Sequence, residues 1–244
     1  MKLRLAKFIS RSGYCSRREA ERLIAAGMVT VDGARTNVDE VYFIDQFNKV
    51  LVCDNLINHS PIKTRLWLYH KPRGVLVSKN DPFGRSVVFD HLPSDMPHTV
   101  AIGRLDYNSE GLLLLTNNPL FAHYMSLPNN GVLRVYKILS YGSCLNNLKS
   151  FELGVKIDGV IHKAHKIYIK SKDGKLGTVV CKLLEGKNRE IRKVFNLLGC
   201  SVKKLLRVSY GDFQLNGIAP NHIVEVENKK LQVVCNKLTG YPPV

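Results

Sequence analysis

The chain contains the stretch Gly103-Arg104-Leu105-Asp106-Tyr107-Asn108-Ser109-Glu110-Gly111-Leu112-Leu113-Leu114-Leu115-Thr116-Asn117. The four consecutive leucines predict a buried strand, and the polar loop before them is flanked by two glycines. This loop places Asp106 at the edge of the strand. By residue type and spacing alone, such a carboxylate more often caps a loop amide or pairs with Arg104 than takes part in catalysis. The stretch therefore marks a candidate site and leaves both roles open.

Other short apolar runs of strand length lie on both sides of this stretch. They are Leu66–Tyr69, Val75–Ser78, Leu133–Leu139, Ile167–Ile169 and Thr178–Leu184. Helical periodicity is rarer and is clearest in Arg189–Leu198, whose apolar residues recur at i, i+3, i+4 and i+7. Because strands and helices do not alternate regularly, we predict an α+β domain built on a mixed, largely antiparallel sheet.

The N-terminal residues predict a separate, small helical unit. Ser16-Arg17-Arg18-Glu19 is a capping box, in which Ser16 caps the amide of Glu19 and the Glu19 side chain reaches back. Gly27 ends this helix, and a strand then enters a hairpin turn at Asp32-Gly33. The polar stretch Asp54–Thr64 has no clear period and predicts the joint between two domains, 1–60 and 61–244.

The composition restricts the class of protein and of partner. The 244 residues include 36 Lys and Arg but only 20 Asp and Glu, a net charge of +16, and 45% are hydrophobic. No apolar run approaches the roughly 20 residues of a membrane span, and we expect a cytoplasmic monomer. The six scattered cysteines lack metal-ligand spacing and favour reduced thiols without a metal. So basic a chain predicts an anionic partner, with nucleic acid first.

Basic residues gather on the predicted N-terminal helices. Arg18 and Arg22 are four residues apart and share a helix face, while Arg17 lies in the first turn, where free amides attract phosphate. The candidate RNA-binding residues here are Lys7, Arg11, Ser16, Arg17, Arg18 and Arg22. Charge alone also fits a solvated helix face or a general polyanion or DNA binder, which would be indifferent to RNA structure.

A second basic surface is predicted around residues 187–207. Arg189 and Lys193 are displaced toward the rim of their helix, because its apolar face is buried. The candidate RNA-binding residues of this surface are Arg104, Lys187, Arg189 and Lys193. From charge alone, it is a second phosphate-binding surface.

Two of these regions resemble known families. The pattern from Arg4 to Gly33, with its helices and hairpin, resembles the S4 RNA-binding domain, in which two helices and a hairpin grip structured RNA. Gly103–Asn117 resembles the catalytic-aspartate motif of RNA pseudouridine synthases. Together they are similar to the branch that modifies ribosomal RNA one site at a time. The resemblance implies that Asp106 is the essential acid.

Further segments resemble the same family in the same order. Tyr69–Gly74 is similar to its N-K-P-x-G element, although the residues alone indicate only a Pro-Gly turn. In the K-x-Y-x-V strand, the resemblance places Tyr136 against the target base. In the E-G-x-x-x-Q-[IV]-R element it pairs Arg192 with the catalytic carboxylate, and Glu190 stands where Gln is usual. The closing motif implies that Leu206 shapes the uracil pocket.

The implied reaction breaks the bond from C1′ to N1 of uridine, turns the detached base and joins C1′ to C5. No electron or group enters from outside, so we expect neither cofactor nor metal. One ionised acid suffices if it adds to the sugar, adds to the ring or abstracts the C2′ proton, and a nearby guanidinium favours the ionised form. The expected partner is ribosomal RNA or an assembling ribosomal particle, with large-subunit 23S rRNA favoured.

The main alternative is a non-catalytic ribosome-assembly factor of the S4 type. It shares every basic feature and differs only at the active site. Intact Asp106, Tyr136 and Arg192 favour the enzyme.

Overall fold

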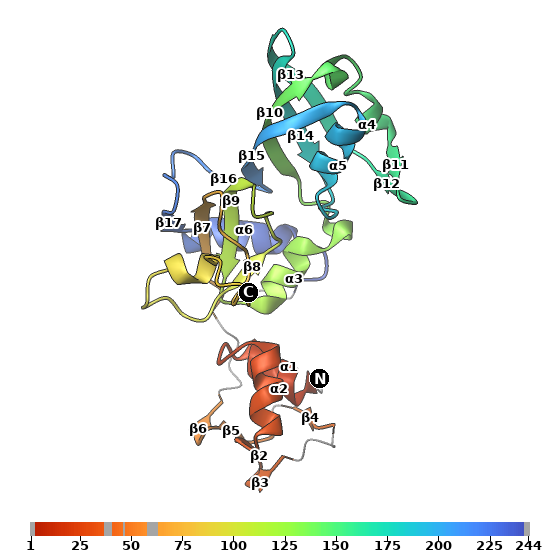
Figure 1. Cartoon of the computed structure of the whole chain (residues 1–244). Helices are drawn as coiled ribbons and strands as arrows, with labels where there is room; N and C mark the ends of the chain where they lie inside the picture. The colour runs from red at the N-terminus through yellow and green to blue at the C-terminus, as the bar shows by residue number, and fades with distance from the viewer. Residues whose placement is uncertain (1–2, 37–40, 46, 58–62, 242–244) are drawn as a thin grey trace.

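The structure, a computed structural model, describes residues 3–36, 41–45, 47–57 and 63–241. Residues 3–57 form a small unit in which two helices pack on short strands (Figure 1). Its elements are β1 (Leu3–Arg4), α1 (Leu5–Arg11), α2 (Arg17–Ala25), β2 (Val29–Val31), β3 (Ala34–Arg35), β4 (Phe43–Ile44), β5 (Val50–Val52) and β6 (Asn55–Leu56). The strands pair as β1-β4 and as a sheet in the order β3-β2-β5-β6.

The local patterns of this unit fold largely as predicted. The amide of Glu19 donates to Oγ of Ser16 at 3.2 Å, so Ser16 caps α2. The Glu19 carboxylate, however, pairs with Arg22, with 3.1 Å between Oε2 and Nη1. Asp32 and Gly33 both have positive φ, +51° and +86°, which suits the hairpin between β2 and β3.

The apolar core of this unit is separate from that of the rest. Its buried residues all lie between Leu5 and Ile57 and form a cluster of their own. Because β6 still pairs with β5, the unit continues at least to Leu56. The predicted boundary between residues 60 and 61 lies outside the described residues.

One large sheet organises the remaining chain. Its strands are β7 (Leu66–Lys71), β8 (Val100–Ile102), β9 (Glu110–Thr116), β10 (Arg134–Gly142), β13 (Lys166–Asp173), β14 (Leu176–Leu183), β15 (Cys200–Tyr210), β16 (Phe213–Gln214) and β17 (Ile223–Glu225). The order is β13-β14-β10-β15-β9-β7-β17, with β8 beside β9 and β16 beside β15. Only the β15–β9 pair is parallel among these described strands. The prediction of an α+β domain with a mixed, largely antiparallel sheet is confirmed.

Helices and a small hairpin complete this region (Figure 1). They are 3₁₀ helix η1 (Val88–His91), α3 (Pro119–Ser126), η2 (Pro128–Asn130), η3 (Ser143–Asn146), α4 (Ser150–Leu153), the hairpin β11 (Val155–Ile157) and β12 (Val160–His162), α5 (Glu190–Leu197) and α6 (Asn228–Lys237). The predicted helix is α5, and its apolar face is buried. Val75–Ser78 is not a strand: Leu76 makes only an isolated bridge to Val87, so the apolar run reflects packing of Val75 into the core instead of continuous pairing.

The four leucines of β9 are fully buried because the strand lies inside the sheet, between two layers of core. Leu113 and Leu115 pack into one apolar cluster, and Leu112 and Leu114 pack into another. At the start of the strand, a Cβ on Gly111 would lie 2.3 Å from the backbone oxygen of Arg207. Glycine therefore permits the close approach of β9 and β15, which brings the loop before β9 beside β15.

The described helices include none that is long and apolar enough to span a bilayer. Cys15, Cys53, Cys181 and Cys235 are free thiols, as predicted, whereas Cys200 is disulfide-bonded. The prediction of reduced thiols is thus wrong for Cys200, since spacing along the chain does not report distance in the fold. In the described ranges, no three His, Cys, Asp or Glu side chains gather in a metal-binding group.

Candidate active site

Asp106 lies in the loop between β8 and β9, at the mouth of a small cavity. The loop is turned by a hydrogen bond from the Ser109 amide to the Asp106 carbonyl at 3.0 Å. The Asp106 side chain is 27% exposed. We call this space, of about 70 Å³, the aspartate cavity. Its lining includes Asp106, Tyr136, Leu183, Glu190, Arg192 and Leu205. The carboxylate is thus reachable from solvent and partly enclosed.

Arg192, on α5, faces this carboxylate. Its Nε lies 4.0 Å from Oδ2 of Asp106. Its two terminal nitrogens donate to the carbonyls of Asn108, at 2.8 Å, and Val202, at 3.3 Å. Nε is buried and has no hydrogen-bond partner in the described structure. The guanidinium is therefore fixed by two backbone contacts, and its third donor group is left beside Asp106.

Burial and neighbouring charges lower the pKa of Arg192. Burial lowers the pKa of Arg192, the negative charge of Asp106 raises it, and the positive charges of Arg189 and Arg73 lower it further. Four cations (Arg104, Lys187, Arg189 and Arg192) and two acids (Asp106 and Glu190) line the aspartate cavity, so its field favours a bound anion.

Lys71 is a site residue that the sequence analysis did not identify. Its side chain is fully buried at the end of β7, and Nζ donates to the carbonyls of Ser109 and Pro72, both at 2.8 Å. The Gly74 amide also donates to the carbonyl of Tyr107 at 2.9 Å. Lys71 and the Pro-Gly turn thus hold the part of the loop that follows Asp106, at Tyr107 and Ser109. The Lys-Pro pair in Tyr69–Gly74 was the available signal, and it was interpreted only as a turn.

Tyr136 is brought to the site by β10. Its side chain is buried, and its Cα partners in the neighbouring strands are Cys181 and Arg207. It lines both the aspartate cavity and the larger cavity described below. The phenol ring therefore lies where a planar base could stack beside Asp106.

The closing motif lines the cavity with a different leucine. Leu205 is buried and lines the aspartate cavity together with Leu183. Leu206 is absent from that lining, and its Cδ1 lies close to Gly111 on the neighbouring strand. Successive residues of a strand point to opposite faces, so Leu205 faces this cavity and Leu206 does not; a role of Leu206 in the uracil pocket stays a prediction.

Glu190 lines the aspartate cavity and has its own hydrogen-bond partners there. It is buried at the start of α5, and its Oε1 lies 3.3 Å from Nδ1 of His162, on β12. Its other oxygen accepts from the Lys187 amide at 3.4 Å. The residue that stands where the family has Gln is thus held by partners on its own side of the cavity.

The predicted basic residues divide between two places. Arg104, Lys187 and Arg189 line the aspartate cavity, whereas Lys193 is exposed on α5 outside its lining. The N-terminal group lies on α1 and α2: Lys7, Arg17, Arg18 and Arg22 are exposed, and Arg11 is partly buried. The Ser16 hydroxyl is occupied by its helix cap. Two of these arginines also form exposed pairs at 3.1 Å, Arg17 with Glu21 and Arg22 with Glu19.

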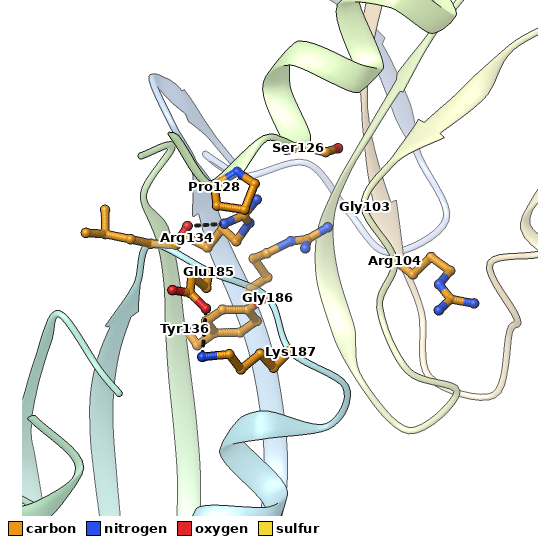
Figure 2. A pocket seen from close by; sticks show the side chains of 11 residues that line it. Gly103, Arg104, Ser126, Pro128, Arg134, Tyr136, Glu185, Gly186 and Lys187 are labelled. Atoms are coloured by element: carbon orange, nitrogen blue, oxygen red, sulfur yellow. Dashed lines mark hydrogen bonds and ion pairs between the residues drawn. The ribbon is translucent and has the colours of Figure 1, made fainter. Parts of the chain in front are cut away.

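A second cavity adjoins the first, and Figure 2 shows it from close by. We call it the arginine cavity. It measures about 290 Å³ and is lined by Gly103, Arg104, Ser126, Pro128, Arg134, Tyr136, Leu184, Glu185, Gly186, Lys187 and Arg207. Arg134 and Arg207 were not identified from the sequence. The available signal was that both are basic residues inside apolar strand patterns.

Comparison with known families identifies both parts of the chain. Residues 65–197 match the family model of RNA pseudouridylate synthase, and residues 3–38 match that of the S4 domain. The crystal structure of a pseudouridylate synthase shares the fold, with a TM-score of 0.66 and 21% identity, covering 97% of this chain and all of that one.

Relatives that cover most of this chain carry the same family name. An uncharacterized RNA pseudouridine synthase of Rickettsia typhi is 41% identical over 239 residues, covering 98% of both chains. The ribosomal large subunit pseudouridine synthase B of Yersinia pestis is 34% identical over 217 residues, covering 87% of this chain and 68% of the relative. Since the family model covers more than half of the chain and these relatives span nearly all of it, the chain belongs to the RNA pseudouridine synthases, isomerases that act on RNA.

Proposed function

We propose that this enzyme isomerises a uridine of large-subunit 23S rRNA, using Asp106 as its catalytic acid and no cofactor. The observation that carries the chemical part is the partly enclosed Asp106 carboxylate, 4.0 Å from Arg192 and in the same cavity lining as Tyr136. The choice of substrate is supported by the Yersinia pestis relative, which is named for the large ribosomal subunit.

The protein must do three things in this reaction: bind the extruded base, assist bond cleavage and exclude water. The target uridine must leave its helix, which costs a few kcal/mol, and stacking on the Tyr136 ring offsets part of that cost. Asp106 then assists cleavage of the C1′–N1 bond, by one of the three routes that remain open. After the detached uracil turns, C5 bonds to C1′, the C5 proton is released and N1 gains a proton. Water must stay out during this interval, or the base would be lost.

Arg192 acts on Asp106 by position and charge. The carbonyls of Asn108 and Val202 hold the guanidinium in place. It therefore keeps a positive charge 4.0 Å from the Asp106 carboxylate when RNA covers the site.

The N-terminal unit would provide a second binding surface for the same RNA. We propose domains at 1–60 and 61–244, supported by the separate apolar clusters of the two parts. Two linked binding surfaces raise the effective concentration of each for one RNA molecule. The substrate is ribosomal RNA or an assembling particle, which implies a cytoplasmic location; a monomeric state stays a prediction.

Release of tritium from 23S rRNA labelled at uridine C5 tests the proposal. The full chain should release tritium, and Asp106→Asn should slow release by at least about 100-fold while binding RNA as tightly as the native chain. Asp212→Asn is the matched control, since Asp212 pairs with Lys237 on the surface, far along the chain from the Asp106 loop.

Two outcomes contradict the proposal. Equal release by the native chain and Asp106→Asn would remove Asp106 from the chemistry. Tight RNA binding without release from either naked 23S rRNA or ribosomal particles would favour the non-catalytic assembly factor.

A further inference from the structure

The arginine cavity contains two buried cations that the isomerisation described above does not use. Arg134 is 7% exposed and Arg207 is 2% exposed. Arg134 donates to the carbonyl of Leu184 at 2.6 Å and to the hydroxyl of Tyr210 at 2.8 Å. Arg207 donates through Nε to the carbonyl of Leu112 at 2.7 Å, and its Nη2 is buried without a hydrogen-bond partner in the described structure. The two side chains are thus held in place with donor capacity to spare.

These two charges have no acidic partner among the described residues. Both guanidinium groups lie against the ring of Tyr210, 4.7 Å and 5.1 Å from its centroid, and their hydrogen bonds run to neutral oxygens. Glu185 also lines the cavity, but its carboxylate is half exposed and pairs with Lys187 at 2.7 Å, as Figure 2 shows. Burying a cation without a countercharge costs several kcal/mol, so the cavity is built to gain from a bound anion.

The position of the cavity indicates which anion it takes. Its lining shares Arg104, Tyr136, Gly186 and Lys187 with the aspartate cavity, so the two cavities lie next to each other, with Tyr136 in the lining of both. Arginine matches the geometry of phosphate oxygens with paired donors. A nucleotide whose base lies against Tyr136 has backbone phosphates on either side of its ribose.

We propose that Arg134 and Arg207 form a phosphate subsite, which binds a backbone phosphate next to the target uridine. The proposal rests on the function proposed above. The subsite would fix the ribose relative to Asp106, because a phosphate held beside the cavity leaves few rotations to the sugar attached to it. Free inorganic phosphate could bind through the same contacts as an RNA backbone phosphate, so the experiment has one arm for each source.

The first arm measures binding of 23S rRNA as a function of salt. Each phosphate contact adds about 0.7 to the slope of log K against log salt for single strands. Arg207→Gln and Arg134→Gln should each lower the slope by about that amount. Arg65→Gln is the control, since Arg65 is a partly exposed arginine paired with Glu225, and should leave the slope unchanged. Two independent variants keep the test valid if one of them fails to fold.

The second arm uses inorganic phosphate and needs no RNA. Phosphate at about ten times its dissociation constant, against chloride of equal ionic strength, should raise the unfolding midpoint of the native chain by a few degrees. The same shift should appear in Arg65→Gln and be absent from Arg207→Gln and Arg134→Gln.

The outcomes separate this proposal from the function it rests on. An unchanged salt slope in both folded variants overturns the subsite, even if the native chain modifies 23S rRNA. A phosphate shift that depends on Arg207, together with an unchanged RNA slope, overturns the RNA backbone as the source of the anion. If the two variants lower the salt slope but the native chain releases no tritium, the proposed reaction is refuted and the phosphate subsite is supported.

Discussion

Nζ of Lys71 donates to the carbonyl of Ser109 at 2.8 Å, which fastens the end of β7 to the loop that carries Asp106. The ammonium group is fully buried, and burial lowers the pKa of Lys71 from 10.5 to about 8, although the charges of Asp106 and Glu110 act in the opposite direction. Burying an ammonium group is costly, and its hydrogen bonds to the carbonyls of Ser109 and Pro72 offset part of that cost.

The titration of Lys71 predicts how stability changes with pH. Between about pH 8 and 10.5, the unfolded chain holds a proton on this amine that the folded chain has lost, so folding is favoured as pH rises. Relative to Lys71→Met, the unfolding free energy of the native chain should therefore rise by up to about 1.4 kcal/mol per pH unit in this window and stay level below it. Denaturant unfolding at each pH measures the difference.

Lys204→Met is the control for that experiment, because Lys204 is half exposed and pairs with Glu110. Its stability profile should run nearly parallel to that of the native chain above pH 8. Parallel profiles for native and Lys71→Met would show that Lys71 keeps an ordinary pKa.

Substitution of Arg192 should affect the rate more than the affinity. In Arg192→Lys an ammonium group replaces the guanidinium group, which contacts two carbonyls and lies 4.0 Å from Asp106. The Asp106 carboxylate therefore loses a positively charged partner held in a fixed position. We expect single-turnover tritium release to fall by about 100-fold, with RNA dissociation constants within a few-fold of the native value. A variant that only weakens RNA binding would place Arg192 among the phosphate contacts instead.

Gly111 should tolerate no side chain. A Cβ there would lie 2.3 Å and 2.8 Å from the backbone oxygen and nitrogen of Arg207, at a φ of +106°. Gly111→Ala should lower the unfolding free energy by more than about 3 kcal/mol, since two strands must separate. Gly84→Ala, with positive φ and open space around it, should cost only about 1 kcal/mol. Similar losses from both would mean that β9 and β15 can move apart cheaply.

The arginines of α2 should affect RNA binding without affecting the chemistry. Arg17, Arg18 and Arg22 are exposed, and the pairs with Glu21 and Glu19 are surface pairs worth little, so all three remain available to phosphate. Replacing all three by Gln should weaken RNA binding and flatten its salt dependence by up to about one slope unit per lost contact. The rate of single-turnover tritium release at saturating enzyme should equal that of the native chain. Unchanged salt dependence in the triple variant would argue against an N-terminal grip.

Some features could be predicted from the sequence because neighbouring residues decide them. The cap at Ser16, the hairpin at Asp32-Gly33 and the helix that begins at Glu190 each follow from hydrogen bonds or side-chain spacing within a few residues. The burial of Leu112–Leu115 follows from an apolar run that no solvent-facing strand would carry.

Other features depended on which distant strands become neighbours. Parallel pairing of β15 with β9 sets Arg207 opposite Gly111, and the alternation of β15 then directs Leu205 and not Leu206 to the aspartate cavity. Antiparallel pairing of β15 with β10 brings Arg134 and Arg207 into neighbouring strands, where both are buried.

The sequence by itself determined the family and the α+β class and predicted Asp106 as the acid, because these features reside in contiguous motifs. Only the tertiary structure decided that Lys71 fastens the Asp106 loop, and that two arginines from separate strands share one cavity in which the acid, Glu185, pairs with Lys187 instead. The physical reason is that burial and strand register are properties of the packed sheet. A one-residue step in register reverses which side chain meets the site, and local pattern does not report it.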